Sequence, residues 1–296
     1  MTRTSEPKRE RLEELVGAPG RLPMEDLVEA THERAPGQPL IRVPSRRNPR
    51  LSRVLERVNA DVELQTLWRC ANVNAVDRLR LTDHGPVHVQ IVANAALRIL
   101  QLLTDAGIAP SVVANYGLAR EDAEVIVVLG ALLHDLGIAV HRDEHEHFSL
   151  VVAAPKLREL LAGVYEPEPA TIVWAETMHA IISHRWDVAC LTIEAGVVKV
   201  ADALDMAKGR SRIPFELGKV DIHSVSALAI DSVTLRKGDR KPVAIDIGMS
   251  NSAGIFQVDE LLRRKLEHSS IRDYVEVHAE IKGEVERRLI SIYEIS

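Results

Sequence analysis

The spacing of the apolar residues changes twice along the chain and divides it into three parts. Residues 1–50 show no regular spacing and are interrupted by Pro and Gly, which predicts an irregular N-terminal extension with one short helix at 24–34. From Leu51 the apolar residues recur at three- and four-residue steps, through Val54, Leu55, Val58 and Val62, which is the helical period. Further helices are predicted at 86–105, 120–136, 145–163, 168–184 and 190–208. Pro155 is expected to kink or split the helix that contains it.

After residue 215 the apolar residues alternate with polar ones, which is typical of strands. Residues 228–235 and 243–247 predict two strands, and the sequence Lys-Gly-Asp-Arg at 237–240 predicts the turn between them. A helix at 258–266 and strands at 274–281 and 285–295 follow, although the last segment also fits a helix. The chain is therefore predicted to be mainly α, with a helical domain at 51–215 and a small α+β domain at 216–296.

The composition excludes several classes of protein. Hydrophobic residues make up 46% and charged residues 27%, which is typical of a globular chain. The net charge of −6 and the aromatic content of 3% make nucleic acid an unlikely partner. The two cysteines provide neither a disulfide framework nor a thiolate-rich metal site. The N-terminus is polar and the longest apolar run, 125–133, is far too short to span a membrane, so we expect a soluble cytoplasmic protein without membrane contact.

A basic cluster lies at the start of the helical part. Its members are Arg42, Arg46, Arg47, Arg50 and Arg53. One interpretation is a solvated linker, and the other is a contact to phosphates or to a partner subunit, since a homo-oligomer is left open.

Histidine and aspartate residues gather at the ends of the predicted helices. His134 and Asp135 end the most apolar helix, where an ionisable pair is costly to bury without a partner, and a metal ion is such a partner. Other members of the pattern precede or follow neighbouring helices: His84, His88, His145, His147, His179, His184 and Asp202. Imidazole and carboxylate groups are the ligands of hard-to-borderline divalent cations, and the lack of thiolates argues against a structural zinc site.

This order of histidine and aspartate residues over about 60–215 resembles the HD-domain metal-dependent phosphohydrolase superfamily. The resemblance implies a helical HD core in which the first metal ion is bound by four residues, His88, His134, Asp135 and Asp202. It implies that Asp135 bridges to a second ion, which is also bound by His145 and His184. His145 is preferred over His147 because a small residue, Ser149, follows it four positions later. His141 and His179 are expected to lie outside the ligand set.

The resemblance also suggests residues for the reaction. His84 stands four residues before His88, as the general acid of the cyclic-nucleotide phosphodiesterases does, but the alternative is a hydrogen bond that orders the turn. Arg210 and Arg212 follow the last ligand and either bind phosphate, with Asp205 orienting one of them, or form a solvated helix end. Arg142 and Arg185 are further phosphate-binding candidates. The sequence departs from the family's pattern at Ile138, where a lysine is frequent, and it has no Gly-Tyr-Pro triplet.

The activity implied by the resemblance is hydrolysis of a phosphoester, such as a nucleotide or a related small phosphorylated molecule. Two divalent ions, drawn from Mn, Fe, Co, Ni and Zn, would hold a bridging hydroxide for attack on phosphorus. No phosphate-binding loop or dinucleotide motif is present in the sequence. Two alternatives remain: a regulatory module that binds a nucleotide or a partner, and a di-iron oxygenase with a similar ligand set.

Overall fold

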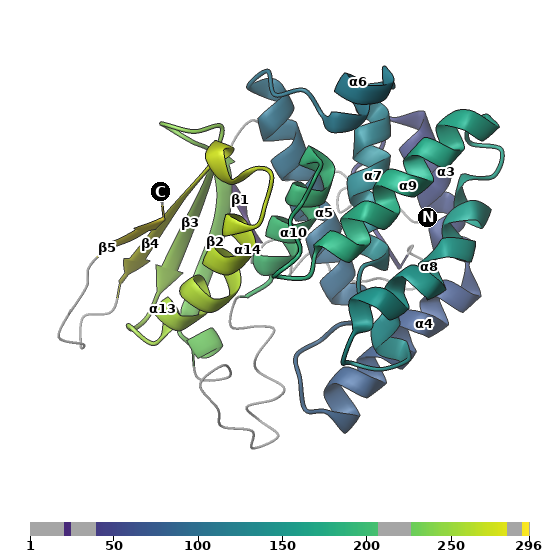
Figure 1. Ribbon diagram of the computed structural model, residues 1–296. Coiled ribbons are helices and arrows are strands. Elements are labelled where there is room, and N and C mark those ends of the chain that lie inside the picture. The colour runs from purple at the N-terminus through teal and green to yellow at the C-terminus, as the bar shows by residue number, and fades with distance from the viewer. Residues whose placement is uncertain (1–20, 25–39, 207–225, 283–291, 296) are drawn as a thin grey trace, which may run out of the picture.

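The computed structural model describes residues 21–24, 40–206, 226–282 and, for the backbone, 292–295. Helices make up the larger part of these residues, and they lie beside a five-stranded sheet (Figure 1). The predicted fold class, a mainly helical core followed by a C-terminal α+β region, is confirmed. The predicted boundary between residues 215 and 216, the helix at 24–34 beyond Met24, and the two arginines 210 and 212 lie outside the described residues.

The helical core is built from helices whose ends agree with local sequence signals. Asn48 and Asp61 accept backbone hydrogen bonds at the first turns of α3 and α4, and proline occupies the first turn of α3, α5 and α9. The helices are α3 (Pro49–Ala60), α4 (Val62–Asn72), α5 (Pro86–Asp105), α6 (Ser111–Tyr116), α7 (Arg120–Leu133), α8 (His145–Leu161), α9 (Pro167–Ser183) and α10 (Ile193–Ala203).

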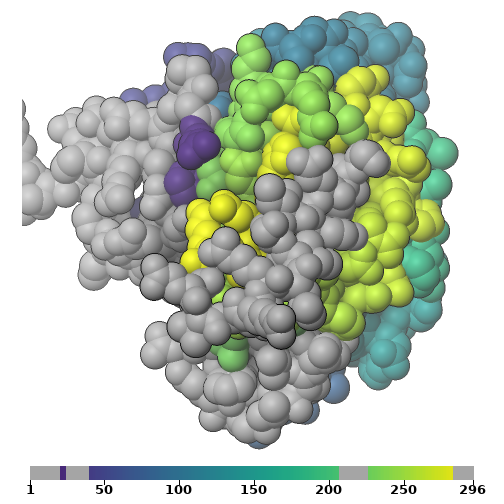
Figure 2. Space-filling view, turned by 90° about the vertical axis from the view of Figure 1, so that its left-hand side faces the viewer, coloured from purple at the N-terminus to yellow at the C-terminus, as the bar shows by residue number. Residues whose placement is uncertain are grey.

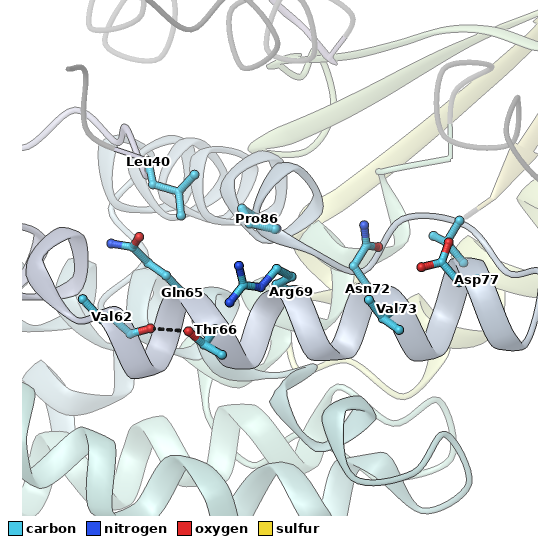
Figure 3. Close-up of a pocket in the computed structure, with 10 residues that line it drawn as sticks. Leu40, Val62, Gln65, Thr66, Arg69, Asn72, Val73, Asp77 and Pro86 are labelled. Atoms are coloured by element: carbon cyan, nitrogen blue, oxygen red, sulfur yellow. Dashed lines mark hydrogen bonds between the residues drawn. The ribbon is translucent and has the colours of Figure 1, made fainter. Parts of the chain in front are cut away.

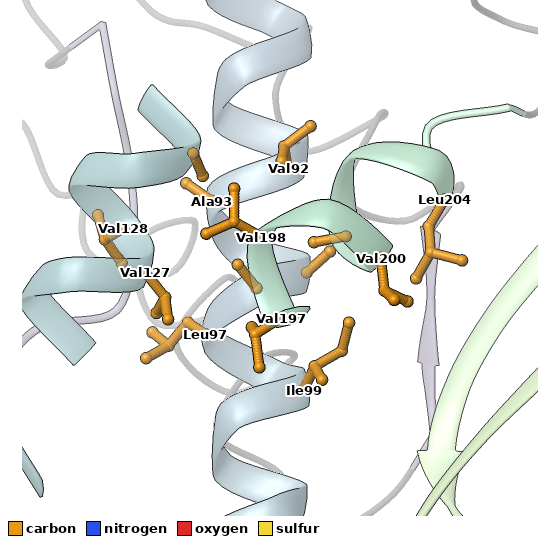
Figure 4. Close-up of a cluster of buried hydrophobic side chains, with 14 of the residues drawn as sticks. Val92, Ala93, Leu97, Ile99, Val127, Val128, Val197, Val198, Val200 and Leu204 are labelled. Carbon is orange, nitrogen blue, oxygen red and sulfur yellow. The ribbon is translucent and has the colours of Figure 1, made fainter. Parts of the chain in front are cut away.

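The centre of the core is α5, which packs against α7 and α10. Apolar side chains from these three helices meet in one cluster, including Leu97, Val128 and Val198 (Figure 4). In the described part of the chain, α5 is the one helix long and apolar enough to cross a membrane, and 83% of its most apolar window is buried inside the protein. A helix that is apolar on all sides is also what the middle of a core requires, so its composition is weak evidence for a membrane span.

The sheet contains one strand from the N-terminal part of the chain and four strands from the C-terminal part. Its strands, in spatial order, are β1 (Leu22–Pro23), β2 (Ile230–Lys237), β3 (Val243–Met249), β4 (Val275–Ile281) and β5 (Ile292–Ile295). Neighbouring strands are antiparallel except β3 and β4, which are parallel. Parallel strands need a crossover, and it is supplied by a helix made of α13 (Gly254–Gln257), a π-helical segment (Val258–Arg263) and α14 (Arg264–Glu267).

In the described parts of the N-terminal extension, residues 40–48 have no helix or strand, as predicted, but residues 22–23 form the short strand β1. β1 pairs with β2 at the edge of the C-terminal sheet, and Figure 2 shows the dark purple atoms of 21–24 beside the green atoms of that sheet. Ile41 and Val43 are buried in the core. Arg50 in the basic cluster forms an ion pair of 2.6 Å with Asp122, so this arginine binds within the chain.

Two details inside the helices also differ from the prediction. Asp61 ends α3 and caps α4, so Val62 begins a new helix and is 75% exposed, although its spacing predicted an apolar face. Pro155 lies within the continuous helix α8, so of its two predicted effects the split is wrong and the kink stays a prediction.

Candidate metal centre

The six predicted metal ligands come together at the ends of five helices. Each end places one or two polar side chains at the same buried point between α5, α7, α8, α9 and α10. Three overlapping groups of three residues have ligand atoms within 4.8 Å of one another, and together they contain His88, His134, Asp135, His145, His184 and Asp202.

Small residues set the approach of α8 to the end of α7. A Cβ atom at Gly137 would overlap the carbonyl oxygen of His145, so only glycine allows this approach. The N–H of Gly137 donates a hydrogen bond of 2.8 Å to Oγ of Ser149. This contact gives a physical reason for the small residue four positions after His145, because it fixes the first turn of α8 beside Asp135.

The turn before α5 is also held by side chains. Oδ1 of Asp83 accepts hydrogen bonds from the N–H groups of Gly85 and His88, at 3.1 and 3.2 Å. Oδ1 of Asn72 accepts one from the N–H of His84 at 3.0 Å. His88 is thereby fixed in the first turn of α5 and points into the core.

Three of the four histidines are oriented in the same way. Nδ1 of His134, His145 and His184 lies 2.8, 3.0 and 2.5 Å from the carbonyl oxygen three residues earlier. A carbonyl oxygen only accepts, so in His134 and His184 Nδ1 carries the proton and Nε2 presents a lone pair. Nδ1 of His145 also lies 2.6 Å from Nη1 of Arg142, which only donates, so both tautomers of His145 fit its contacts. His88 has the same orientation through a different partner, because its Nδ1 lies 2.7 Å from Oδ2 of the buried Asp205.

The first ligand set contains four acceptor atoms directed at one point. Nε2 of His88 and Nε2 of His134 are 3.3 Å apart. Oδ2 of Asp135 lies 3.4 and 3.2 Å from these two nitrogens, and Oδ1 of Asp202 lies 3.3 and 3.6 Å from them. Ligands about 2.0–2.2 Å from a shared ion are separated by roughly 3.0–3.5 Å, so a divalent cation fits this set.

The second set shares one aspartate with the first. Nε2 of His145 and Nε2 of His184 are 3.3 Å apart, and Oδ1 of Asp135 lies 3.2 and 3.7 Å from them. Asp135 therefore directs one carboxylate oxygen to each set, and its side chain is 5% exposed.

The electrostatics of the centre favour a bound cation. Burial alone would lower the pKa of His134, but the neighbouring Asp135 and Asp202 raise it to about 9. Burial would raise the pKa of Asp202, but Lys265 and the histidines hold it well below its usual value. Burial and the nearby His134 lower the pKa of His184. The cluster thus keeps its carboxylates ionised and attracts positive charge, which a proton supplies in the absence of a metal ion.

The sequence comparisons agree with this arrangement. Residues 88–207 match the family model described as the HD domain. A Methanocaldococcus jannaschii protein, itself described as uncharacterised, is 45% identical over 222 residues, which are 75% of this chain and 86% of that protein. This chain belongs to the HD-domain family. No solved structure matches it. The HD domain begins at His88 and includes all six residues of the cluster.

The other histidines predicted near the HD centre lie outside the cluster. His147 is at the surface, with a side chain that is 58% exposed and pairs with Glu144 at 2.8 Å. His179 accepts a hydrogen bond from the N–H of Leu191 through Nε2, at 3.0 Å, and His141 is exposed. The ring of His84 lies 5.5 Å from the ring of His88, and its Nδ1 is 2.7 Å from the carbonyl oxygen of Thr82.

Of the four predicted phosphate-binding arginines, the structure describes Arg142 and Arg185. Arg210 and Arg212 are outside the described residues, so the orientation of one of them by Asp205 stays a prediction, and Oδ2 of Asp205 contacts His88. Arg185 pairs with Glu144 and Asp187 at 3.0 and 2.7 Å.

Two cationic side chains, those of Arg142 and Lys265, contact predicted metal ligands directly. Nη1 of Arg142 lies 2.6 Å from Nδ1 of His145. Lys265, which the sequence analysis missed, binds Oδ2 of Asp202. Lys265 is 63 residues from Asp202 and belongs to no motif, so no sequence signal pointed to it.

A surface groove lies next to the turn that carries His84. It has a volume of about 580 Å³ and runs along α4 to the start of α5 (Figure 3). Asn72 and Pro86 line the groove. Asn72 also accepts the hydrogen bond from the N–H of His84, so the groove adjoins the turn before α5. It contains none of the six clustered residues.

Proposed function

We propose that this HD-domain protein is a metal-dependent phosphohydrolase that cleaves a phosphoester with two divalent metal ions. The observation that carries the proposal is the pair of ligand sets joined by Asp135, one oxygen of which faces each set. A protein that binds one structural ion has no use for a second, adjoining set of ligands. The ions belong to the group Mn, Fe, Co, Ni and Zn, which His and Asp ligands accept according to availability.

The proposed roles of the ligands follow from the geometry. His88, His134 and Asp202 hold the first ion, His145 and His184 hold the second, and Asp135 is shared between them. Divalent ions at such a site supply Lewis-acid activation of a water molecule and positive charge for the phosphate oxygens. Asp205 and the backbone carbonyls keep the imidazole rings in the tautomer that leaves Nε2 available.

Two further residues are proposed to act on the substrate. His84 stands beside the first ligand set without belonging to it, and it is proposed to hold the proton that the leaving oxygen takes up. Arg142 lies against His145 and is proposed to bind a phosphate oxygen with its permanently charged guanidinium group. The same role for Arg210 and Arg212 stays a prediction from the sequence.

The proposed substrate is a small phosphorylated molecule such as a nucleotide. Three carboxylates, Asp135, Asp202 and Asp205, lie at the centre. Two divalent cations together carry more positive charge than these carboxylates offset, so the loaded centre favours an anionic substrate. The net charge of −6 disfavours a nucleic acid polymer. A cytoplasmic setting without membrane contact belongs to the same proposal.

The proposal is tested by removing bound metal with a chelator and restoring one divalent ion at a time. Each form is then assayed with a panel of nucleotides and aryl phosphates. We expect hydrolysis that depends on the added ion, and its loss together with most bound metal in Asp135→Ala. Asp143→Ala is the matched control, because it removes an exposed carboxylate from the neighbouring loop.

Two results would contradict the proposal. Nucleotide binding without turnover under every metal condition would favour the regulatory module. Iron-dependent oxygen consumption without phosphate release would favour the oxygenase.

A further inference from the structure

Asp202 is held from outside the HD domain, unlike the histidine ligands. The histidines are oriented by carbonyl groups of their own helix ends or by Asp205, all within the segment 88–207. Oδ1 of Asp202 faces His88 and His134, whereas Oδ2 binds the ammonium group of Lys265. Lys265 belongs to α14, in the crossover helix of the C-terminal sheet. The side chain of Lys265 is 14% exposed and that of Asp202 is 12% exposed, so the ion pair is shielded from solvent.

The position of Lys265 is fixed by the docking of α14 on α10, and Figure 1 shows the two helices beside each other. Just after α14, Oγ of Ser269 donates a hydrogen bond of 3.3 Å to the carbonyl oxygen of Gly196. Lys265 meets Asp202 near the end of α10, while Ser269 meets Gly196 near its start, so the two segments run antiparallel. Two separated contacts of this kind fix both the position and the direction of the lysine-bearing helix.

The docking contact requires a glycine in α10. A Cβ atom at Gly196 would lie 2.8 Å from Oγ of Ser269 and 3.1 Å from the backbone nitrogen of Ser270, and it would overlap Oγ of Ser270. Oγ of Ser270 also donates a hydrogen bond of 2.6 Å to the carbonyl oxygen of Thr192. An added methyl group therefore displaces both serine hydroxyls from their hydrogen bonds and presses on the backbone of the segment that follows α14.

We infer that Lys265 is a positioning residue that orients Asp202 as a metal ligand, so that the C-terminal α+β region completes the metal centre of the HD domain. The inference rests on the metal binding of the proposed function and not on its hydrolytic step. The ammonium group binds Oδ2, whereas Oδ1 faces His88 and His134 and would be left for a metal ion, so the two would not compete for one atom. Without Lys265, Oδ2 is left buried without this charged partner, and the carboxylate is free to turn away from the histidines.

The first test measures metal affinity by chelator competition with Co²⁺ and the metal-free full-length protein. Substitution of a group that orients a metal ligand typically costs 10–100-fold in affinity, so we expect a loss of about this size in Lys265→Met. The visible absorption spectrum of bound Co²⁺ is expected to change as well. Lys265→Arg keeps a cation at this position and is expected to restore most of the affinity and the spectrum.

A matched control lies on the same crossover helix. Arg263→Met removes a cation that forms ion pairs with Asp259 and Glu267 on that helix, so the variant is expected to bind Co²⁺ like the wild type. Unchanged or tighter binding in Lys265→Met, or no recovery in Lys265→Arg, would overturn the inference. Failure of the wild-type protein to bind any divalent ion would overturn the proposed function as well, so the two failures are distinguishable.

A second variant tests the docking contact without changing any charged group. Gly196→Ala displaces the segment after α14 and is expected to weaken Co²⁺ binding in the same direction as Lys265→Met. If both changes act through Asp202, the double variant binds no more weakly than Lys265→Met alone. Normal affinity in Gly196→Ala, or fully additive losses in the double variant, would refute the idea that the docking of α14 acts on the metal ion through Lys265 and Asp202.

Discussion

Asp205 provides a sharp test of how the metal centre is oriented. Its Oδ2 accepts a hydrogen bond of 2.7 Å from Nδ1 of His88, and both side chains are buried. The sequence predicts a further role for Asp205, the orientation of Arg210 or Arg212. We expect Asp205→Ala to weaken binding of the first metal ion, because the ring of His88 loses the acceptor that fixes its tautomer.

The size of the loss follows from the type of contact. A buried hydrogen bond to a charged group contributes about 1.5–3 kcal/mol. Substitution of a partner of a metal-bound histidine costs about 10–100-fold in affinity, which is about 1.4–2.8 kcal/mol. Asp205→Asn keeps an oxygen acceptor without the charge, and a neutral hydrogen bond contributes about 0.5–1.5 kcal/mol. The expected order of affinity is therefore wild type, then Asn, then Ala.

The assay is competition between the protein and a chromogenic chelator for Co²⁺ or Zn²⁺, with far-UV circular dichroism to verify folding. Phosphate release from the same samples shows whether activity falls with occupancy. Equal affinity in the wild type and Asp205→Ala would refute the reasoning about the tautomer. Equal affinity in the Asn and Ala variants would show that the charge of Asp205, and not its hydrogen bond, is what matters.

The remaining predictions concern the second ligand set, the leaving group and pH. His145→Ala is expected to lower the metal-to-protein ratio toward one by elemental analysis, whereas the ratio in His147→Ala, a change at the surface, stays near two. His84→Ala is expected to retain metal and lose roughly 10²–10⁴-fold in rate with alkoxide leaving groups but much less with p-nitrophenol; an equal loss with both would exclude proton donation. Although burial opposes it, backbone amides of the β2–β3 turn and Arg240 lower the pKa of Glu276. Its stabilisation is therefore present above the unfolded-state pKa of about 4.3 and is lost as the pH falls, so the difference in unfolding free energy between wild type and Glu276→Gln is expected to shrink in acid, as measured by urea titration.

The local elements were largely predictable because periodicity records which side of an element is buried. The run at 86–105 matches α5, and the alternation at 243–247 lies within β3. The prediction was wrong at Val62, since a spacing of four residues does not reveal that the cap at Asp61 starts a new helix. It also missed β1, because a two-residue strand has no periodicity and exists only through its pairing with β2.

The candidate site was predictable in its residue types, since ionisable groups at the ends of apolar helices are costly without a shared partner. The histidine and aspartate pattern pointed to all six residues that the structure brings together. Sequence spacing left His145 and His147 as rivals two positions apart. The structure buries the first and exposes the second, because the close approach at Gly137 sets the rotation of α8.

The tertiary structure alone decided which groups support the ligands. Asp205 is three residues from Asp202, yet its partner His88 is 117 residues away. Lys265 reaches Asp202 across 63 residues. Periodicity and motifs report the local burial of one helix or strand, whereas these contacts depend on how the helices pack, and α14 meets α10 only where a glycine permits it. The sequence by itself therefore determined the elements and the chemistry of the centre, and helix packing determined what holds its ligands in place.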